Sequence, residues 1–169
     1  MTESTIHIEN GWALYAHPLF IARLEEITVA VERVMANDPE GFHHHPVYKL
    51  FDAVSANILI NVPSDPTHPC YRQGNTLGRD FKHWFRVKKQ GIPPRYRLFF
   101  QFRSEAPMTI IYAWLNDERT LRKDGDKNDV YAVFTAMLLN GKMPNSYTDL
   151  IAACDVLEYG NSTTGTKEE

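Results

Sequence analysis

The residues best suited to chemistry in this sequence are basic side chains at alternating positions of two short segments. Arg86 and Lys88 are two positions apart, and Arg95 and Arg97 have the same spacing. Side chains two positions apart on a β-strand share a face, so two neighbouring strands would gather these four cations within about 7 Å. Guanidinium groups bind phosphate through paired hydrogen bonds, and a Lys ammonium adds a point charge. The pattern therefore indicates a phosphate-binding site.

Positive charge is concentrated in the middle of a chain whose 169 residues sum to a net charge of −3. Residues 79–103 contain eight Lys or Arg and one Asp, whereas residues 1–60 and 104–169 each carry −5. A positive patch on an acidic body attracts polyanions locally and limits binding elsewhere. The alternative is a solvated strand face whose charges pair with the acidic flanks. Composition alone leaves both interpretations open.

Such a cluster could cleave RNA without a metal ion, because RNA supplies its own nucleophile, the 2′-OH. Cations beside the phosphorus would stabilise the pentacoordinate phosphorane. The reaction also needs a base for the 2′-OH proton and an acid for the leaving 5′-oxygen. Trp84 and Tyr131 could stack on unpaired bases, although the size of Trp84 and Trp114 favours positions in the core.

Other chemically active residues give less specific patterns. The run His43–His45 suggests a metal site, but adjacent side chains rarely converge on one ion, and no Cys or carboxylate cluster accompanies it at ligand spacing. His83 precedes the basic segment and could act as an acid or base, with a surface position as the favoured interpretation. Cys70 and Cys154 lie in unrelated contexts, which suits a reducing cytosol.

The elements that must position these residues can be predicted from hydrophobic periodicity. Apolar spacings of three and four residues are typical of helices, and they predict helices over residues 18–36, 47–62, 129–138 and 146–157. Alternating or short apolar runs predict strands over residues 11–17, 83–89, 95–103 and 108–115. The last of these is apolar on both faces, as expected for a central strand.

This order predicts an α+β fold, a small antiparallel sheet with N-terminal and C-terminal helices on one face. The other face would be free, and the charged strand positions could populate it. We expect a single domain over residues 1–159 and a disordered tail over residues 160–169. Since no apolar run approaches about 18 residues and the start lacks a signal-peptide pattern, we expect a cytoplasmic protein with no membrane partner.

Five sequence blocks resemble a known family: NGWALYAHPLF, LGRDFKHWFRVK, RYRLFFQF, WLNDERTLR and DVYAVFTAML. In this order, over about residues 10–150, they resemble the YhaV family of bacterial toxins in the RelE-like superfamily of small ribonucleases. The resemblance implies a RelE-like fold, cleavage of mRNA that blocks translation, and no metal or other cofactor. It also implies a type II toxin–antitoxin pair with a cognate AbrB-like (PrlF-type) antitoxin. The mRNA would be cut free or on the ribosome, and operator DNA would be bound through the antitoxin complex.

The resemblance also implies roles for individual residues. Arg86 and Arg97 would hold the scissile phosphate, and Lys88 would be the base or would stabilise the phosphorane. Arg122, preferred to Arg119, would place a cation near the leaving group. The residues expected to bind RNA around them are Lys82, Lys89, Arg95, Arg103, Arg119 and Tyr131, the last also a candidate for the superfamily's C-terminal aromatic residue or base.

One departure and two alternatives accompany this interpretation. Where the family motif usually has Tyr-Gly, this chain has Asp124-Gly125, and because an acid there would repel phosphate, that loop receives no catalytic role. A non-catalytic RNA- or ribosome-binding inhibitor of translation would have the same patch but give no cleavage products. A metal enzyme using His43–His45 would instead lose activity with a chelator.

Overall fold

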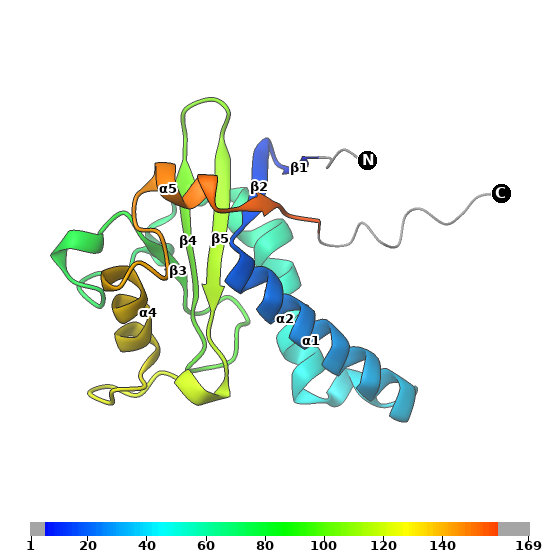
Figure 1. Cartoon of the computed structure of the whole chain (residues 1–169). Coiled ribbons are helices and arrows are strands. Elements are labelled where there is room, and N and C mark those ends of the chain that lie inside the picture. Colours follow the sequence, from blue (N-terminus) through cyan, green and yellow to red (C-terminus); the bar gives the residue numbers. More distant parts are fainter. Residues whose placement is uncertain (1–5, 159–169) are drawn as a thin grey trace.

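The computed structural model describes residues 6–158 and contains one mixed sheet with helices on both faces (Figure 1). The strands are β1 (His7–Glu9), β2 (Trp12–Ala16), β3 (Phe85–Val87), β4 (Leu98–Arg103), β5 (Thr109–Leu115) and β6 (Asp155–Val156). The helices are α1 (Pro18–Asn37), α2 (Pro46–Ala56), α3 (Val62–Ser64), α4 (Val130–Leu139) and α5 (Tyr147–Ala152). A π-helical segment, Asn57–Asn61, joins α2 to α3, and 3₁₀ turns cover Phe42–His44, Pro69–Tyr71, Arg79–Phe81 and Glu118–Thr120. The predicted tail at residues 160–169 lies outside the described residues.

The predicted α+β class is confirmed, with one change in the sheet. The strand order is β1-β2-β5-β4-β3, and β6 pairs with β2. All pairings are antiparallel except β2 with β5, which is parallel, with Tyr15 opposite Ile111. Short connections force consecutive strands to be antiparallel, but the chain between β2 and β5 includes α1 and α2 and imposes no such constraint. The sheet is therefore mixed rather than purely antiparallel.

The first strand, β1, was missed because residues before Gly11 look like a polar lead. It pairs with β2 through a two-residue turn in which Asn10 and Gly11 have φ values of 50° and 84°. An Asn-Gly turn with both φ values positive matches the right-handed twist of a β-hairpin. The turn residues, rather than hydrophobic alternation, carry the signal for this strand.

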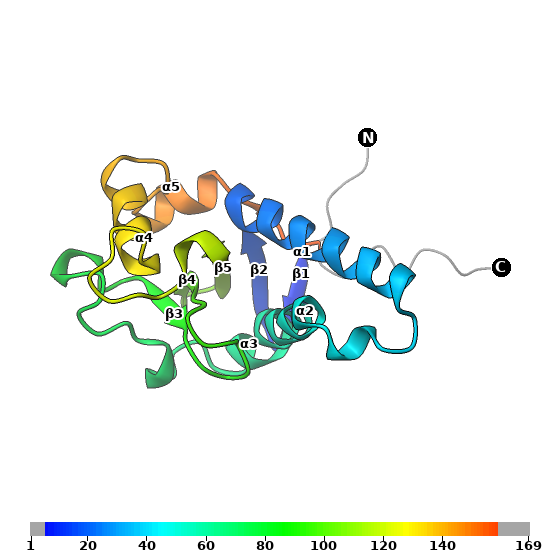
Figure 2. The same cartoon turned by 90° about the horizontal axis from the view of Figure 1, so that it is seen from below.

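Two apolar cores lie on opposite faces of the sheet. One packs α1 and α2 against residues such as Leu98 and Tyr112, and the other packs α4 and α5 against Trp84 and Phe99. Figure 2 shows α4 and α5 on one side of the strands and α2 and α3 on the other. Within residues 6–158, no helix is both long and apolar enough to cross a membrane.

The prediction of a free sheet face is wrong. Phe99, on the face that was expected to be open, is fully buried, and its ring stacks on Phe134 of α4 with centroids 4.1 Å apart. Helix α4 is apolar over most of its surface and must bury that surface against the sheet. The basic strand positions therefore lie at the edge of a second core.

Candidate active site

The register of β3 and β4 brings the predicted cations together. Arg86 lies opposite Phe99 and Val87 opposite Leu98, the last pair of the ladder; Lys88 directly follows β3, and Arg97 directly precedes β4. Arg86, Lys88 and Arg97 thus share the sheet face that α4 covers. The alternation in the sequence predicted the face of each strand, and the register now joins the two strands into one cluster.

A single hydroxyl connects the two arginines. The Tyr131 hydroxyl accepts hydrogen bonds from Arg86 Nε at 3.1 Å and from Arg97 Nε at 3.0 Å. Each arginine also donates through Nη1 to a backbone carbonyl, Arg86 to Cys70 at 2.9 Å and Arg97 to Tyr96 at 2.8 Å. These contacts fix both guanidinium groups, because each is held at two of its nitrogens.

Neither arginine is neutralised. Arg86 is 9% exposed and Arg97 is 6% exposed, yet neither has a carboxylate within ion-pair distance in the part of the chain that the structure describes. Buried charges are normally paired, since removing an ion from water costs several kcal/mol. Among residues 6–158, neither Nη2 atom has a hydrogen-bond partner, and neither atom is enclosed. Two preorganised and uncompensated cations therefore face an accessible space, which favours an anionic ligand.

The Tyr131 hydroxyl can form one more hydrogen bond, as a donor. A phenol oxygen offers one O–H donor and two acceptor positions. Both acceptor positions are taken by arginine N–H groups, so the proton can only be donated to a third partner. Among residues 6–158, no acceptor for that proton is present. The hydroxyl therefore keeps one unused donor beside the two guanidinium groups.

The start of α4 positions Tyr131. Asp129 is the N-cap of this helix: its carboxylate accepts the Tyr131 N–H at 2.9 Å and the Lys123 N–H at 2.5 Å. It also pairs with Arg122 Nη1 at 2.8 Å. Burial raises the pKa of Asp129, but the hydrogen bonds from Arg122 and the two backbone N–H groups outweigh it, and the net pKa is lowered. The carboxylate therefore stays ionised and anchors the turn that carries Tyr131.

Arg122 lies over the ring of Tyr131 rather than beside its hydroxyl. Its guanidinium carbon is 5.0 Å from the ring centroid, and Arg97 approaches the same ring at 5.8 Å. Its pKa is raised, chiefly by the hydrogen bond to Asp129, and Asp124 is a second carboxylate at 3.8 Å. Arg122 is thus part of the cluster, but its charge is largely compensated.

Two further residues link the cluster to the neighbouring loop. The side chain of the buried Asn116 accepts the Arg97 N–H at 2.8 Å and donates to the carbonyls of Arg95 and Thr120. Arg95, at a positive φ of 79°, exchanges hydrogen bonds with the backbone of Arg122. Arg95 therefore lies next to the cluster, while its Nε is used to hold the loop.

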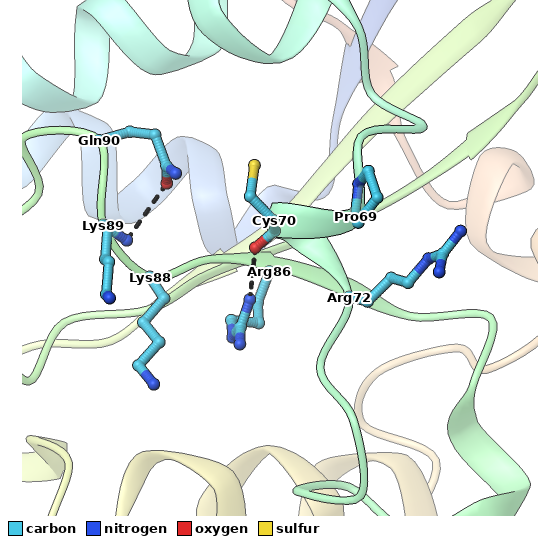
Figure 3. A pocket seen from close by; sticks show the side chains of 7 residues that line it. All are labelled: Pro69, Cys70, Arg72, Arg86, Lys88, Lys89 and Gln90. Carbon is cyan, nitrogen blue, oxygen red and sulfur yellow. Dashed lines mark hydrogen bonds between the residues drawn. The ribbon is translucent and has the colours of Figure 1, made fainter.

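An open cleft of about 310 Å³ adjoins Arg86. It is lined by Pro69, Cys70, Arg72, Arg86, Lys88, Lys89 and Gln90 (Figure 3). A second, wider cleft of about 900 Å³ lies along α4 and includes Arg122 and Tyr131. Arg86 lines the first cleft and Tyr131 the second, so the hydrogen bond between them lies where the two clefts adjoin.

Three of the predicted RNA-binding residues lie outside this cluster. Arg103, at the far end of β4, packs over the Tyr147 ring at 5.8 Å. Arg119 pairs with Asp117 at 2.9 Å, and Lys82 binds the 74–75 turn through its ammonium group. Spacing alone could not separate these cations from the clustered ones, because their partners come from other segments.

The histidines and cysteines have structural surroundings. His45 caps α2 by accepting the Val47 N–H, and the His43 ring stacks on Phe42. No group of three or more potential metal ligands occurs within residues 6–158. Burial raises the pKa of the Cys70 thiol, which therefore is not a thiolate nucleophile at neutral pH. His83 bonds to Asn145, away from the arginine pair.

Sequence reasoning missed three residues of this region: Arg72, Asn116 and Asp129. Arg72 lies in a Pro- and Gly-rich loop that carried no periodic signal. Asp129 could have been found as an N-cap, because an Asp directly before an apolar helical run favours that position. Asn116 offered no local signal, since its partners are backbone groups on two other segments.

Comparison with known proteins places this geometry in a family. The model of the YhaV toxin family, described as a toxin with endonuclease activity of a toxin–antitoxin system, matches residues 14–155. The chain is 41% identical over 142 residues to the ribonuclease toxin YhaV of Escherichia coli K12 and to the toxin YhaV of Escherichia coli O6:H1 strain CFT073. Each alignment covers 83% of this chain and 90% of the relative. No solved structure matches the chain. Arg86, Arg97 and Tyr131 all lie within the matched residues. From the family match and the 41% identity, the chain belongs to the YhaV family of toxin–antitoxin toxins with endonuclease activity.

Proposed function

We propose that this protein is a metal-independent endoribonuclease that cleaves mRNA and so blocks translation. The observation that carries the proposal is the pair of buried, unpaired arginines, Arg86 and Arg97, joined by the hydroxyl of Tyr131. Such a pair attracts the single negative charge of a phosphodiester and compensates the second charge that develops in the phosphorane. The ribonuclease name of the K12 relative supports RNA as the substrate.

In the proposed reaction the 2′-oxygen attacks the adjacent phosphorus. The 2′-OH loses its proton to a base, the new O2′–P bond forms, and the P–O5′ bond breaks as O5′ gains a proton. The products are a 2′,3′-cyclic phosphate and a 5′-hydroxyl. Arg86 and Arg97 hold the non-bridging oxygens and stabilise the extra negative charge of the phosphorane.

Tyr131 and Lys88 are the proposed partners in this step. The free O–H of Tyr131 donates to the phosphate or to the leaving O5′, because both of its acceptor positions are used by the arginines. Lys88, exposed and in the same cleft as Arg86, is the second cation for the phosphorane or the base for the 2′-OH. Arg122 supports the leaving-group side and holds the Tyr131 ring.

The partner expectations are part of this proposal. Membership of a toxin–antitoxin family implies an antitoxin. We propose an AbrB-like antitoxin, operator DNA bound through the complex, and a type II system with a RelE-like toxin. Isolation of the complex from cells that express both genes, followed by operator binding with and without the antitoxin, tests these points.

Expression in growing bacteria tests the proposed activity. Induction of the wild type should arrest growth and produce new 5′ ends in abundant mRNAs by primer extension, whereas Arg86→Ala should produce neither. Growth arrest without new ends would support a non-cleaving RNA- or ribosome-binding inhibitor instead.

A further inference from the structure

The cleft beside Arg86 has an unusual lining. Four of its seven lining residues are cations, and none is an acid. Within residues 6–158, the side chains of Arg72, Lys88 and Lys89 make no ion pair and no hydrogen bond. A concave surface with only positive charge attracts an anion, because low-dielectric walls concentrate the potential.

Arg72 is held in place by its backbone. Its neighbours Tyr71 and Gln73 are both buried, and the Gln73 side chain bonds to the backbone of Leu77 and Phe81. Arg72 itself forms an isolated bridge with Phe85, the first residue of β3. The side chain is therefore free while its point of attachment beside Arg86 is fixed.

The cations of the cleft do not converge on one point. In Figure 3, Arg86 and Lys88 extend to the same side, whereas Arg72 starts from the opposite flank and its guanidinium is directed away from Arg86. As drawn there, the Arg72 guanidinium does not point towards a phosphate held by Arg86 and Arg97. A row of cations of this kind suits successive phosphates of a single strand.

We propose that the Arg72 flank of this cleft is a second phosphate subsite, which binds the phosphodiester adjacent to the scissile one. The inference rests on the proposed function, since it takes RNA as the ligand. It adds a requirement that the arginine pair alone does not impose: the substrate must continue by at least one phosphate on that side. Arg72 is a binding residue in this account and takes no part in proton transfer.

Binding of a non-cleavable RNA tests the subsite. The probe is a short single-stranded 2′-O-methyl oligonucleotide, in a series where each internal phosphate in turn is a neutral methylphosphonate. For the wild type, two adjacent substitutions should each weaken binding by about tenfold. Arg72→Ala should weaken binding of the unmodified probe by about the same factor. In this variant, the methylphosphonate at one of the two positions should cause no further loss of binding, and the other should still weaken it.

Matched variants complete the design. Arg86→Lys should change how strongly a methylphosphonate at the neighbouring position weakens binding. Arg72→Lys should bind the probe nearly as well as the wild type. Arg33→Ala removes an exposed arginine on α1 and should behave as the wild type. The inference would be overturned if each methylphosphonate weakened the binding of the wild type and of Arg72→Ala by the same factor. It would also be overturned if the Arg72 and Arg86 variants changed the effect of the same methylphosphonate. If the wild type binds the probe but cuts no unmodified RNA, the proposed function fails, and the phosphate coupling still decides this inference.

Discussion

At the residue scale, the central feature is a tyrosine hydroxyl held between two arginines that have no counter-ion among residues 6–158. Arg86 and Arg97 use their Nε atoms on Tyr131 and keep their Nη2 atoms accessible. Burying two uncompensated charges lowers the stability of the free protein, and a bound anion would offset this cost. The hydroxyl and the two guanidinium groups therefore belong to one functional unit, and each contribution can be tested by a conservative change.

Removal of the hydroxyl alone should separate catalysis from structure. Tyr131→Phe keeps the ring that packs under Arg122 but removes the proton donor, so kcat should fall by about 10²-fold. Stability should fall by about 1–2 kcal/mol, because two arginine N–H groups lose their acceptor. Single-turnover cleavage and urea unfolding measure the two effects. Unchanged kcat in a folded Tyr131→Phe would exclude the hydroxyl from the reaction.

The two roles open for Lys88 differ in what a charge-conserving change does. Arg at this position keeps a cation but does not deprotonate in proteins. If Lys88 stabilises the phosphorane, Lys88→Arg should keep most of kcat, and Lys88→Ala should lose about 10²-fold. Equal loss in both variants would identify Lys88 as the base. Lys142→Ala, an exposed lysine after α4, is the matched control.

At the element scale, the first turn of α4 determines whether the cluster forms. Asp129 caps the helix and binds Arg122, so one carboxylate fixes both the position of Tyr131 and the cation over its ring. The apolar face of α4 then packs on Phe99 and Trp84 and brings Tyr131 to the basic strands. The position of Tyr131 therefore depends on the helix start, while the strands position Arg86 and Arg97.

Loss of this cap should be visible in the pH dependence of stability. The pKa of Asp129 is lowered in the folded protein, so its contribution is present above the ordinary Asp pKa and is lost as the pH falls through the lowered value. Asp129→Asn should cost about 2 kcal/mol at pH 7 and progressively less below about pH 4. Urea unfolding from pH 3 to pH 7 measures this, with Asp126→Asn as the control. A constant difference across that range would contradict the assigned role.

The elements show which structural features a sequence can predict. Period-two alternation predicted the strand face of Arg86, because side-chain direction in a strand is a local property. The strands are shorter than predicted, and Lys88 and Arg97 lie just outside β3 and β4. Burial of that face was not predicted, since it depends on where the apolar helix α4 packs 30 residues later. Arg72 was missed because its loop has no hydrophobic periodicity. Its place at the cleft also depends on a contact between separate segments, the bridge to Phe85.

At the scale of the whole molecule, charge is separated between a basic centre and an acidic remainder. Three of the four cations at the cleft, Arg86, Lys88 and Lys89, belong to residues 79–103, whereas Arg119 and Arg122, in the acidic part, are paired with carboxylates. RNA should therefore bind at one place and leave the helical body of α1 and α2 free for a protein partner. This division fits a toxin whose activity an antitoxin must control.

The charge distribution predicts a defined salt dependence. Single-stranded RNA that uses about three phosphates should give a slope of about −2 in a plot of log binding constant against log salt. Neutralising a cleft cation, as in Lys89→Ala, should reduce the slope by nearly one unit, and Arg33→Ala should not change it. Fluorescence anisotropy between about 50 and 200 mM salt measures both variants. Equal slopes for the two would show that Lys89 does not contact phosphate.

The central claim is that RNA is cut at the arginine cluster by its own 2′-hydroxyl, without a metal ion. The most direct measurement is end-group analysis of a short RNA incubated with purified protein in excess chelator, beside the same RNA with one 2′-deoxy residue at the cleavage position. The account predicts a 2′,3′-cyclic phosphate and a 5′-hydroxyl from the first RNA, no cut in the second, and no cut of either by a folded Arg86→Ala. Cleavage of the deoxy substrate, or a requirement for a divalent ion, would contradict it.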